Sequence, residues 1–210
     1  MARRSCARRR RTWIVAFGCE AADIGRLQFA GKSAFEVVLR VSAPVISDIS
    51  TGVDDQLEMR QATADQIAEV RELTLKAYAK WIGVTPRKPR PVTADYNEAF
   101  EKHRFDCLYR DGTLVGIVET TPQNDELMIV NVAVDPACQG LGFGTRLMRH
   151  AEEVARMANL SGTRLYTNKL MRENIELYQR LGYRVEKETH HDHGTVAVHM
   201  TRPLLGDSLP

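Results

Sequence analysis

Apolar residues recur along this chain with two different spacings, and each spacing predicts one type of element. From Phe143 to Ala158 they return every three or four positions, which predicts a long amphipathic helix. Residues 126–134 are instead almost continuously apolar, as is typical of a strand at the centre of a sheet with both faces covered. The two patterns together predict a sheet with helices packed against it.

A capping box predicts the start of an earlier helix. Thr63 is followed three positions later by Gln66, and apolar residues then recur at helical spacing as far as Trp81. Glycine and several prolines beyond Trp81 end that helix. Thr93 is expected to cap a shorter helix that runs to about His103.

The remaining segments alternate strands with helices. Turn signals at residues 111–112 and 122–125 separate three strands, and Ser161-Gly162 is expected to end the long helix. This order predicts an α/β (α+β) fold with a mixed sheet flanked by helices. The expected strands are residues 59–61, 105–109, 114–121, 126–134, 164–167, 183–189 and 195–201, and a last helix covers 174–181.

Composition narrows the possible partners. The chain has 210 residues and 43% hydrophobic content, which suits one domain with an appendage. Residues 1–58 hold 9 of the 29 Lys and Arg and 7 of the 27 Asp and Glu, so the remaining 20 cations and 20 anions balance. That balance argues against a broad nucleic-acid-binding face. No apolar run approaches the roughly 20 residues that span a bilayer, so we expect neither nucleic acid nor membrane as a partner.

Cysteine and histidine give no sign of a metal site. The four cysteines, at positions 6, 19, 107 and 138, have neither metal-binding nor redox spacing, so we expect reduced thiols in a cytoplasmic protein. His190, His191, Asp192 and His193 cluster at a predicted hairpin tip. Three imidazoles in such a turn could bind a metal but are more often simply exposed. We expect no metal.

The N-terminal segment permits three interpretations. Arginines crowd its first eleven positions, and no acidic residue precedes Glu20. A signal peptide needs a longer apolar run than Trp13–Phe17, and an arginine-rich transit peptide fits the composition better. The third interpretation is a poorly ordered extension, with Met59 as the functional start. We expect an extension over residues 1–58, a domain over 59–203 and a short tail over 204–210.

Residues 132–145 carry the clearest chemical signal. A Val-Ala-Val strand leads through a turn into Gly140, Gly142 and Gly144, and then into the long helix. The first amides of a helix lack intrahelical partners and lie at the positive end of its dipole, so this order predicts a site for a phosphate. The glycine spacing matches neither a Walker A loop nor a dinucleotide fingerprint, and Gly31-Lys32-Ser33 also lacks P-loop spacing.

Two motifs resemble those of one family. Gln139-x-x-Gly142-x-Gly144, directly after the Val-Ala-Val strand, resembles motif A of the GCN5-related N-acetyltransferases (GNAT family). Residues 165–185 resemble motif B of that family: a strand, a helix that carries Asn and Tyr, and Leu-Gly-Tyr before the next strand. The resemblance covers roughly residues 59–203. It implies a mixed, mostly antiparallel sheet flanked by helices, and acetyl-coenzyme A (acetyl-CoA) as co-substrate.

The resemblance also assigns residues to acetyl-CoA. Loop amides would hold the pyrophosphate, and backbone groups near a bulge of the central strand would bind the pantetheine arm and the thioester oxygen. Asn174 would contact the cofactor, although its place at a helix start also suits an N-cap. The cofactor-binding set is Val132, Ala133, Val134, Gln139, Gly140, Leu141, Gly142, Phe143, Gly144, Thr145 and Asn174.

Acetyl transfer to an amine needs a base for the amine and an acid for the leaving thiolate. Tyr178 is the best candidate acid, although a core tyrosine bonded to a backbone carbonyl would give the same pattern. Members of the family often carry Glu where Val130 stands in this chain. Its absence leaves Glu119 and Glu126 as candidate bases, unless the acceptor needs none.

The sequence therefore predicts an N-acetyltransferase that moves an acetyl group from acetyl-CoA directly to a primary amine of a small molecule or a peptide. A non-catalytic acyl-CoA-binding sensor or partner domain is one alternative, favoured by the missing Glu at position 130. A protein acetyltransferase for terminal or lysine amines is the other. Tyr78, Trp81 and Tyr96 are candidate walls for the acceptor, or ordinary core residues. The sequence does not decide whether the protein forms a homodimer.

Overall fold

The computed structural model describes residues 56–192 and 194–204. The arginine-rich segment, the Gly31-Lys32-Ser33 stretch and His193 lie outside the described residues, as do most of the expected extension and tail. In the part that is described, no helix has the length and apolar character needed to cross a bilayer.

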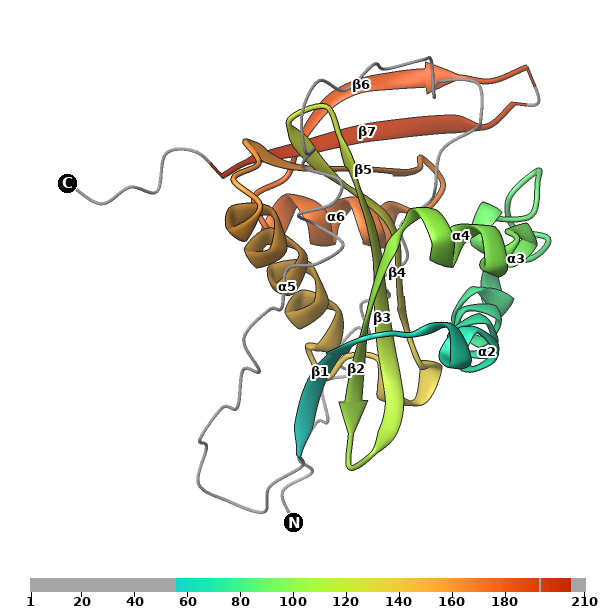
Figure 1. The fold of residues 1–210 in the computed structure, drawn as a ribbon. Coiled ribbons are helices and arrows are strands. Elements are labelled where there is room, and N and C mark those ends of the chain that lie inside the picture. The colour runs from blue at the N-terminus through green and yellow to red at the C-terminus, as the bar shows by residue number, and fades with distance from the viewer. Residues whose placement is uncertain (1–55, 193, 205–210) are drawn as a thin grey trace, which may run out of the picture.

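Within the described residues, seven strands form one sheet in the order β1-β2-β3-β4-β5-β7-β6 (Figure 1). Every neighbouring pair is antiparallel except β4 and β5. The strands are β1 (Leu57–Gln61), β2 (Arg104–Arg110), β3 (Thr113–Gln123), β4 (Glu126–Val134), β5 (Gly162–Asn168), β6 (Arg184–His190) and β7 (Val196–Pro203). The α-helices are α2 (Ile67–Tyr78), α3 (Arg90–Thr93), α4 (Tyr96–Lys102), α5 (Phe143–Met157) and α6 (Arg172–Arg180). The predicted fold class, a mixed and mostly antiparallel sheet flanked by helices, is confirmed.

The sheet separates two apolar cores. Helices α5 and α6 contribute Leu147, Met148 and Tyr178 to one of them. Helices α2 and α4 contribute residues such as Val70 and Tyr96 to the other, and Figure 1 shows α2 and α5 on opposite sides of β3 and β4. Strand β4 is therefore covered on both faces, as its apolar run predicts.

A β-bulge interrupts β4 at Val130. Asn131 pairs with Glu119 across from it, and the next pair along β4 involves Ile129, so Val130 has no partner of its own in this register. The bulge reverses the alternation of side chains, because Ile129 and Val132 face the same core although three positions separate them. The bulge lies before Val132, earlier than the stretch where the resemblance placed it.

Strands β4 and β5 pair only at their beginnings. Glu126 to Met128 run parallel to Gly162 to Arg164, and β5 then continues as a partner of β7 alone. From Ile129 onward, the described register gives no strand partner to the edge of β4 that faces β5. Buried backbone polar groups need partners, so this edge is suited to bind something other than the sheet.

Three predicted helix ends differ from the structure. Asp95, not Thr93, caps α4, since its Oδ1 accepts two backbone N–H groups at 2.9 and 3.3 Å. Helix α5 ends before Asn159, whose φ of 55° is the left-handed conformation that often stops a helix; Gly162 instead opens β5. Helix α6 begins two residues earlier than expected, so Asn174 lies within its first turn and is not the N-cap.

Candidate active site

The glycine-rich loop delivers the start of α5 with its first amides uncapped. A short 3₁₀ turn, η4 (Pro136–Cys138), follows β4 and is capped by Asp135, whose Oδ1 accepts the N–H of Ala137 at 2.8 Å. Gly142 is the N-cap of α5 with φ of 85°, and no side chain caps the helix there. A Cβ on Gly142 would meet no atom within 4 Å, so no neighbouring side chain fills the space next to this residue. Uncapped amides at a helix N-terminus attract an anion, as the loop pattern predicts.

The side chain of Gln139 is buried against β4, unlike the exposed loop around it. Its side chain turns inward, and its Nε2 donates to the backbone oxygen of Val134 at 2.8 Å. The residue is 7% exposed, whereas Leu141 is 56% exposed. The Gln139 side chain therefore ties the loop to the end of β4, which fixes the direction in which the following amides point.

A close approach of α5 to the sheet sets the position of that N-terminus. A Cβ on Gly116 of β3 would lie 2.9 Å from Leu147 Cδ1 and 3.2 Å from the backbone oxygen of Ala133. A side chain at this position would require the end of Leu147 to move, and the Ala133 carbonyl on β4 leaves it little room. Gly116 therefore allows Leu147 of α5 to pack closely against β3.

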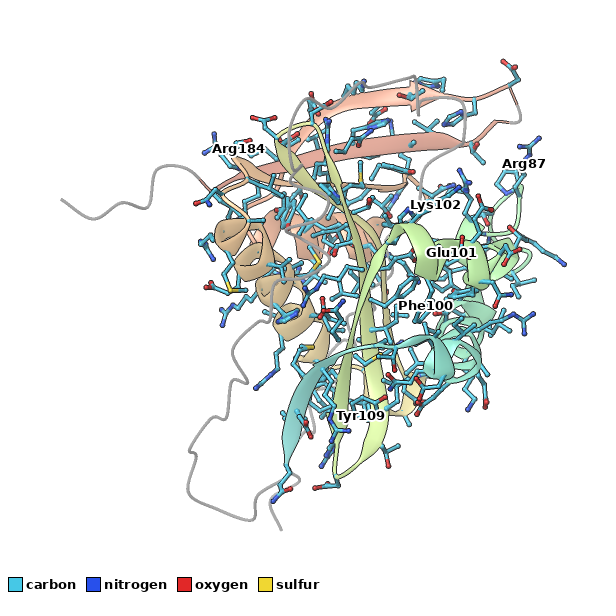
Figure 2. The ribbon with its side chains drawn as sticks, viewed as in Figure 1. Arg87, Phe100, Glu101, Lys102, Tyr109 and Arg184 are labelled. Carbon is cyan, nitrogen blue, oxygen red and sulfur yellow. The ribbon has the colours of Figure 1, made fainter. Side chains whose placement is uncertain are left out.

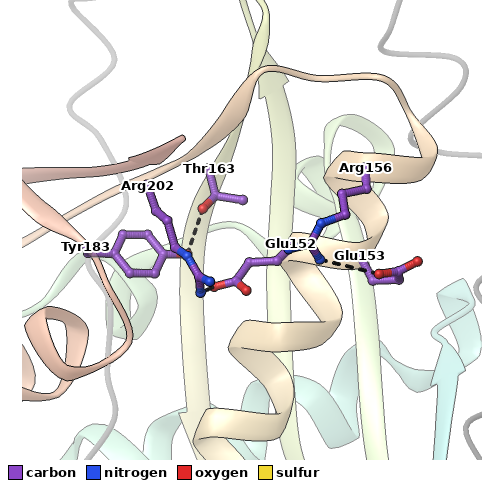
Figure 3. A network of polar contacts seen from close by, with 6 residues as sticks. All are labelled: Glu152, Glu153, Arg156, Thr163, Tyr183 and Arg202. Atoms are coloured by element: carbon purple, nitrogen blue, oxygen red, sulfur yellow. Dashed lines mark hydrogen bonds and ion pairs between the residues drawn. The ribbon is translucent and has the colours of Figure 1, made fainter. Parts of the chain in front are cut away.

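Two groups of polar contacts, one buried and one part-buried, hold α5 against the sheet. Arg104 donates to both carboxylate oxygens of Asp106 at 2.7 and 2.8 Å, and His150 of α5 lies 3.3 Å from the same group. Burial alone would raise the pKa of Asp106, but the neighbouring His150 ring and Arg104 guanidinium hold that pKa below its ordinary value. Further along the helix, Arg202 of β7 donates to Glu152 at 2.5 Å (Figure 3). These ties fix the long helix relative to the strands on both sides of it.

Tyr178 is fully buried, yet its hydroxyl has no hydrogen-bond partner among the described residues. Its neighbour Tyr183 is buried equally, but that hydroxyl lies 2.7 Å from Thr163 Oγ1 (Figure 3). Burial, and then the proximity of Tyr183, raise the pKa of Tyr178 above its usual value. Tyr178 therefore keeps its proton, and a buried hydroxyl without a partner is the kind of exception that calls for a functional explanation.

Asn174 and Tyr78 approach the same region from opposite faces of the sheet. Asn174 is fully buried on α6, where its Nδ2 donates to Met171 Sδ at 3.6 Å. Tyr78, at the end of α2, donates from its hydroxyl to Asn131 Oδ1 at 2.9 Å, directly after the bulge of β4. Burial raises the pKa of Tyr78, and Tyr178 is the next cause, so the two phenols lie within electrostatic reach of each other. Tyr78 thus borders the bulge from the α2 side of the sheet.

The structure separates the two candidate bases. Glu119 is 6% exposed, pairs in register with Asn131 at the bulge, and lies 2.6 Å from His103 Nδ1. Glu126 lies at the other end of β4, where the strand is still paired with β5, and forms an ion pair with Arg164 at 3.3 Å. Only Glu119 is brought to the bulge.

Sequence reasoning did not identify His103 or Asn131 as site residues. The alternation of β4 cannot show the bulge, because a continuous apolar run looks the same with or without it. His103 belongs to a short loop between α4 and β2, and nothing in its local sequence indicates contact with Glu119. Both contacts depend on strand register, which local patterns do not reveal.

The remaining residues that were candidates for the acceptor site or for a metal differ in their exposure. Tyr96 is buried and donates to the backbone oxygen of Pro91 at 3.0 Å, while Trp81 is half-buried beside Lys80. His190 is exposed at the end of β6. Among residues 56–192 and 194–204, no group of three or more His, Cys, Asp or Glu side chains is placed to hold a metal ion.

Comparisons with known proteins bear on this arrangement. The chain matches the sequence profile described as Acetyltransferase (GNAT) family over residues 67–183. Over 113 residues it is 26% identical to "Probable N-acetyltransferase camello" of Xenopus tropicalis. These residues are 51% of this chain and 52% of that protein. The chain therefore spans about half the length of this curated relative.

Two solved structures share the fold. The ribosomal-protein-S18-alanine N-acetyltransferase from Escherichia coli aligns with a TM-score of 0.55 and 17% identity, covering 74% of this chain and 99% of that chain. PaiA N-acetyltransferase from Thermoplasma acidophilum, solved in complex with coenzyme A, aligns with a TM-score of 0.56 and 15% identity, covering 70% and 99%. The resemblance seen in the two sequence motifs is confirmed: with a profile that covers more than half of its residues, the chain belongs to the GNAT acetyltransferase family.

Proposed function

We propose that this protein transfers an acetyl group from acetyl-CoA directly to a primary amine, without an acyl-enzyme. The observation that carries the proposal is the uncapped start of α5, which follows the unpaired edge of β4 through a short glycine-rich loop. A strand edge and a helix N-terminus in series offer hydrogen bonds to an extended amide chain that ends in phosphate. Coenzyme A has this chemistry.

The residues present fit such a ligand. No side chain caps the first amides of α5 and no atom lies within 4 Å of a Cβ on Gly142, so we assign the diphosphate to the amides of Phe143, Gly144 and Thr145. The backbone of Val132 to Val134 is the segment that would bind the pantetheine arm, because it lies on the unpaired edge. When bound, acetyl-CoA supplies an activated thioester, and the protein supplies position and charge stabilisation.

Tyr178 is our candidate for the acid that protonates the departing thiolate. Its hydroxyl keeps its proton and has no hydrogen-bond partner in the described structure. A sulfur that arrives next to it would satisfy a buried group that is otherwise unpaired, so binding and catalysis use the same atom. Asn174, in the same helix, is proposed to contact the cofactor.

The acceptor is proposed to approach from the α2 side of the sheet. Glu119, Tyr78 and Asn131 lie together there, next to the bulge. A buried carboxylate favours a cationic group, and a primary amine in water is mostly an ammonium ion. Glu126 is paired with Arg164 and lies apart, so we assign it no part in the reaction.

A panel of acceptors tests this function. Free lysine, a linear diamine and a hexapeptide with a free N-terminus would each be incubated with acetyl-CoA, and released thiol measured. We expect thiol release that depends on one of these amines, with a product that is heavier by one acetyl group. Binding of coenzyme A without transfer to any amine would instead favour the sensor alternative, which the valine at position 130 motivates.

A further inference from the structure

The contact between His103 and Glu119 is built into the frame of the fold. His103 directly follows α4, and its backbone N–H donates to Ala99 O at 2.8 Å. Phe100, one turn earlier, stacks on Phe105 of β2 with ring centroids 4.1 Å apart, and it points from α4 towards the sheet in Figure 2. The end of α4 is thereby fixed over β2, and His103 is held above β3.

The two side chains differ in their access to solvent. The side chain of Glu119 is 8% exposed, whereas that of His103 is 25% exposed, and Nδ1 of the ring lies 2.6 Å from Glu119 Oε1. We assign the tautomer in which Nδ1 donates this hydrogen bond, because a carboxylate group accepts. The other ring nitrogen, Nε2, then has a free lone pair in the neutral imidazole. A carboxylate that fixes a histidine tautomer in this way prepares the ring to act as a base.

The tyrosines around His103 and Glu119 are not themselves candidate bases. Tyr78 of α2 and Tyr96 of α4 both feel the charge of Glu119, but burial raises the pKa of each phenol above its usual value. They therefore stay neutral hydrogen-bond donors. Glu119 faces Asn131 across one strand spacing of about 4.8 Å, so the pair lies beside the bulge.

The stoichiometry of the proposed reaction demands a base with access to solvent. An ammonium acceptor and acetyl-CoA give an amide, a thiol and one free proton. The nitrogen thus loses two protons: one is needed to protonate the thiolate, and the other must leave the site. The Glu119 side chain is only 8% exposed, whereas the His103 ring, at 25%, has the better route for passing that proton to solvent.

We propose that His103 is the general base for the acceptor amine and that Glu119 is its positioning residue, an inference that rests on the proposed function. Nε2 of His103 takes a proton from the ammonium ion, and Glu119 stabilises the imidazolium. The neutral nitrogen then attacks the thioester carbonyl carbon, the N–C bond forms and the C–S bond breaks. Tyr178 gives its proton to the thiolate and is restored by the second proton of the nitrogen, and His103 releases the first proton to solvent.

The test compares His103→Asn with wild type, using whichever amine of the panel above the wild type acetylates. The Nδ2 of asparagine can still donate to Glu119, so the fold is kept while the basic nitrogen is lost. We expect kcat to fall about 10²-fold or more, with coenzyme A affinity within twofold of wild type. The acidic limb of the pH profile of kcat/KM should disappear. His199→Asn, at a half-buried histidine of β7 that contacts Thr189, is the matched control and should keep wild-type kcat.

A second variant distinguishes loss of the base from a purely structural effect. His103→Ala should also lose turnover and regain part of it when imidazole is added, because free imidazole can occupy the space and accept the proton. Turnover by His103→Asn near the wild-type value, or no gain from imidazole in His103→Ala, would overturn the proposal. If the wild type acetylates no amine of the panel, the proposed function fails together with the base; if it does and His103→Asn is equally active, only the base fails.

Discussion

Two neighbouring tyrosines offer a direct comparison of structural and catalytic roles. Tyr178 and Tyr183 are both buried, and their rings lie 6.0 Å apart at 59°. The Tyr183 hydroxyl is bonded to Thr163 Oγ1, whereas the Tyr178 hydroxyl has no partner in the described structure. Replacement by phenylalanine removes one oxygen in each case and leaves the ring in place.

The expected stabilities differ in sign. Tyr183→Phe loses a hydrogen bond with a net value of about 1 kcal/mol and leaves Thr163 unsatisfied, which costs about 1–3 kcal/mol. Tyr178→Phe removes a polar atom that burial already penalises, so its stability should be unchanged or higher. One kcal/mol shifts Tm by about 2–4 °C in a chain of this size, so Tyr183→Phe should melt several degrees below Tyr178→Phe.

The expected activities are reversed. Tyr178→Phe should lower kcat about 10²-fold or more, the usual contribution of a general acid, while coenzyme A binding stays close to wild type. Tyr183→Phe should keep kcat within about twofold of wild type, because its hydroxyl serves the fold. Thermal denaturation, calorimetry with coenzyme A and thiol release measure the three quantities. If Tyr178→Phe is destabilised like Tyr183→Phe and keeps full turnover, Tyr178 is a core residue and the acid must be sought elsewhere.

Three further substitutions test other parts of the structure. Gly142→Val should abolish coenzyme A binding in calorimetry, whereas Gly194→Val should keep it; both positions have positive φ and open space, so both variants bear similar backbone strain. Equal binding by the two variants would contradict a role for the loop. Gly162→Ala should lose about 1–3 kcal/mol of stability, because its Cβ would lie 2.8 Å from the backbone oxygen of Arg202, and an unchanged Tm would refute that close contact. Burial lowers the pKa of Lys80 from 10.5 to about 7 in the folded chain. The charged lysine therefore destabilises the fold fully below pH 7, and this penalty falls to zero as the pH rises to 10.5. Lys80→Met should therefore raise Tm at pH 7, with a gain that shrinks as the pH approaches 10; a gain that is independent of pH would contradict the lowered pKa of this half-buried amine.

Sequence patterns predicted the elements that depend on local signals. The capping box at Thr63 is present, with both of its hydrogen bonds, and the apolar run at residues 126–134 matches β4. The glycine loop led correctly into α5, since Gly142 adopts the left-handed conformation that glycine favours. Local conformation is encoded by neighbouring residues, so a single sequence is sufficient for these features.

Other features depend on contacts between distant residues. Thr93 and Asp95 are both plausible caps in sequence, and only the packing of α4 decides between them. Glu119 and Glu126 looked equivalent as strand-end carboxylates, but the register of β3 and β4 buries one at the bulge and pairs the other with Arg164. Register is set by the whole sheet, which is why the sequence left both candidates open.

The central claim is that backbone amides at the start of α5 bind the diphosphate of coenzyme A. Titration of the ¹⁵N-labelled protein with coenzyme A, followed by amide chemical shifts, tests it most directly. We predict that the largest shifts fall on residues 140–145, and that pantetheine, which lacks the diphosphate, fails to produce them. Tight binding of coenzyme A that leaves the amides of residues 140–145 unshifted would contradict the account.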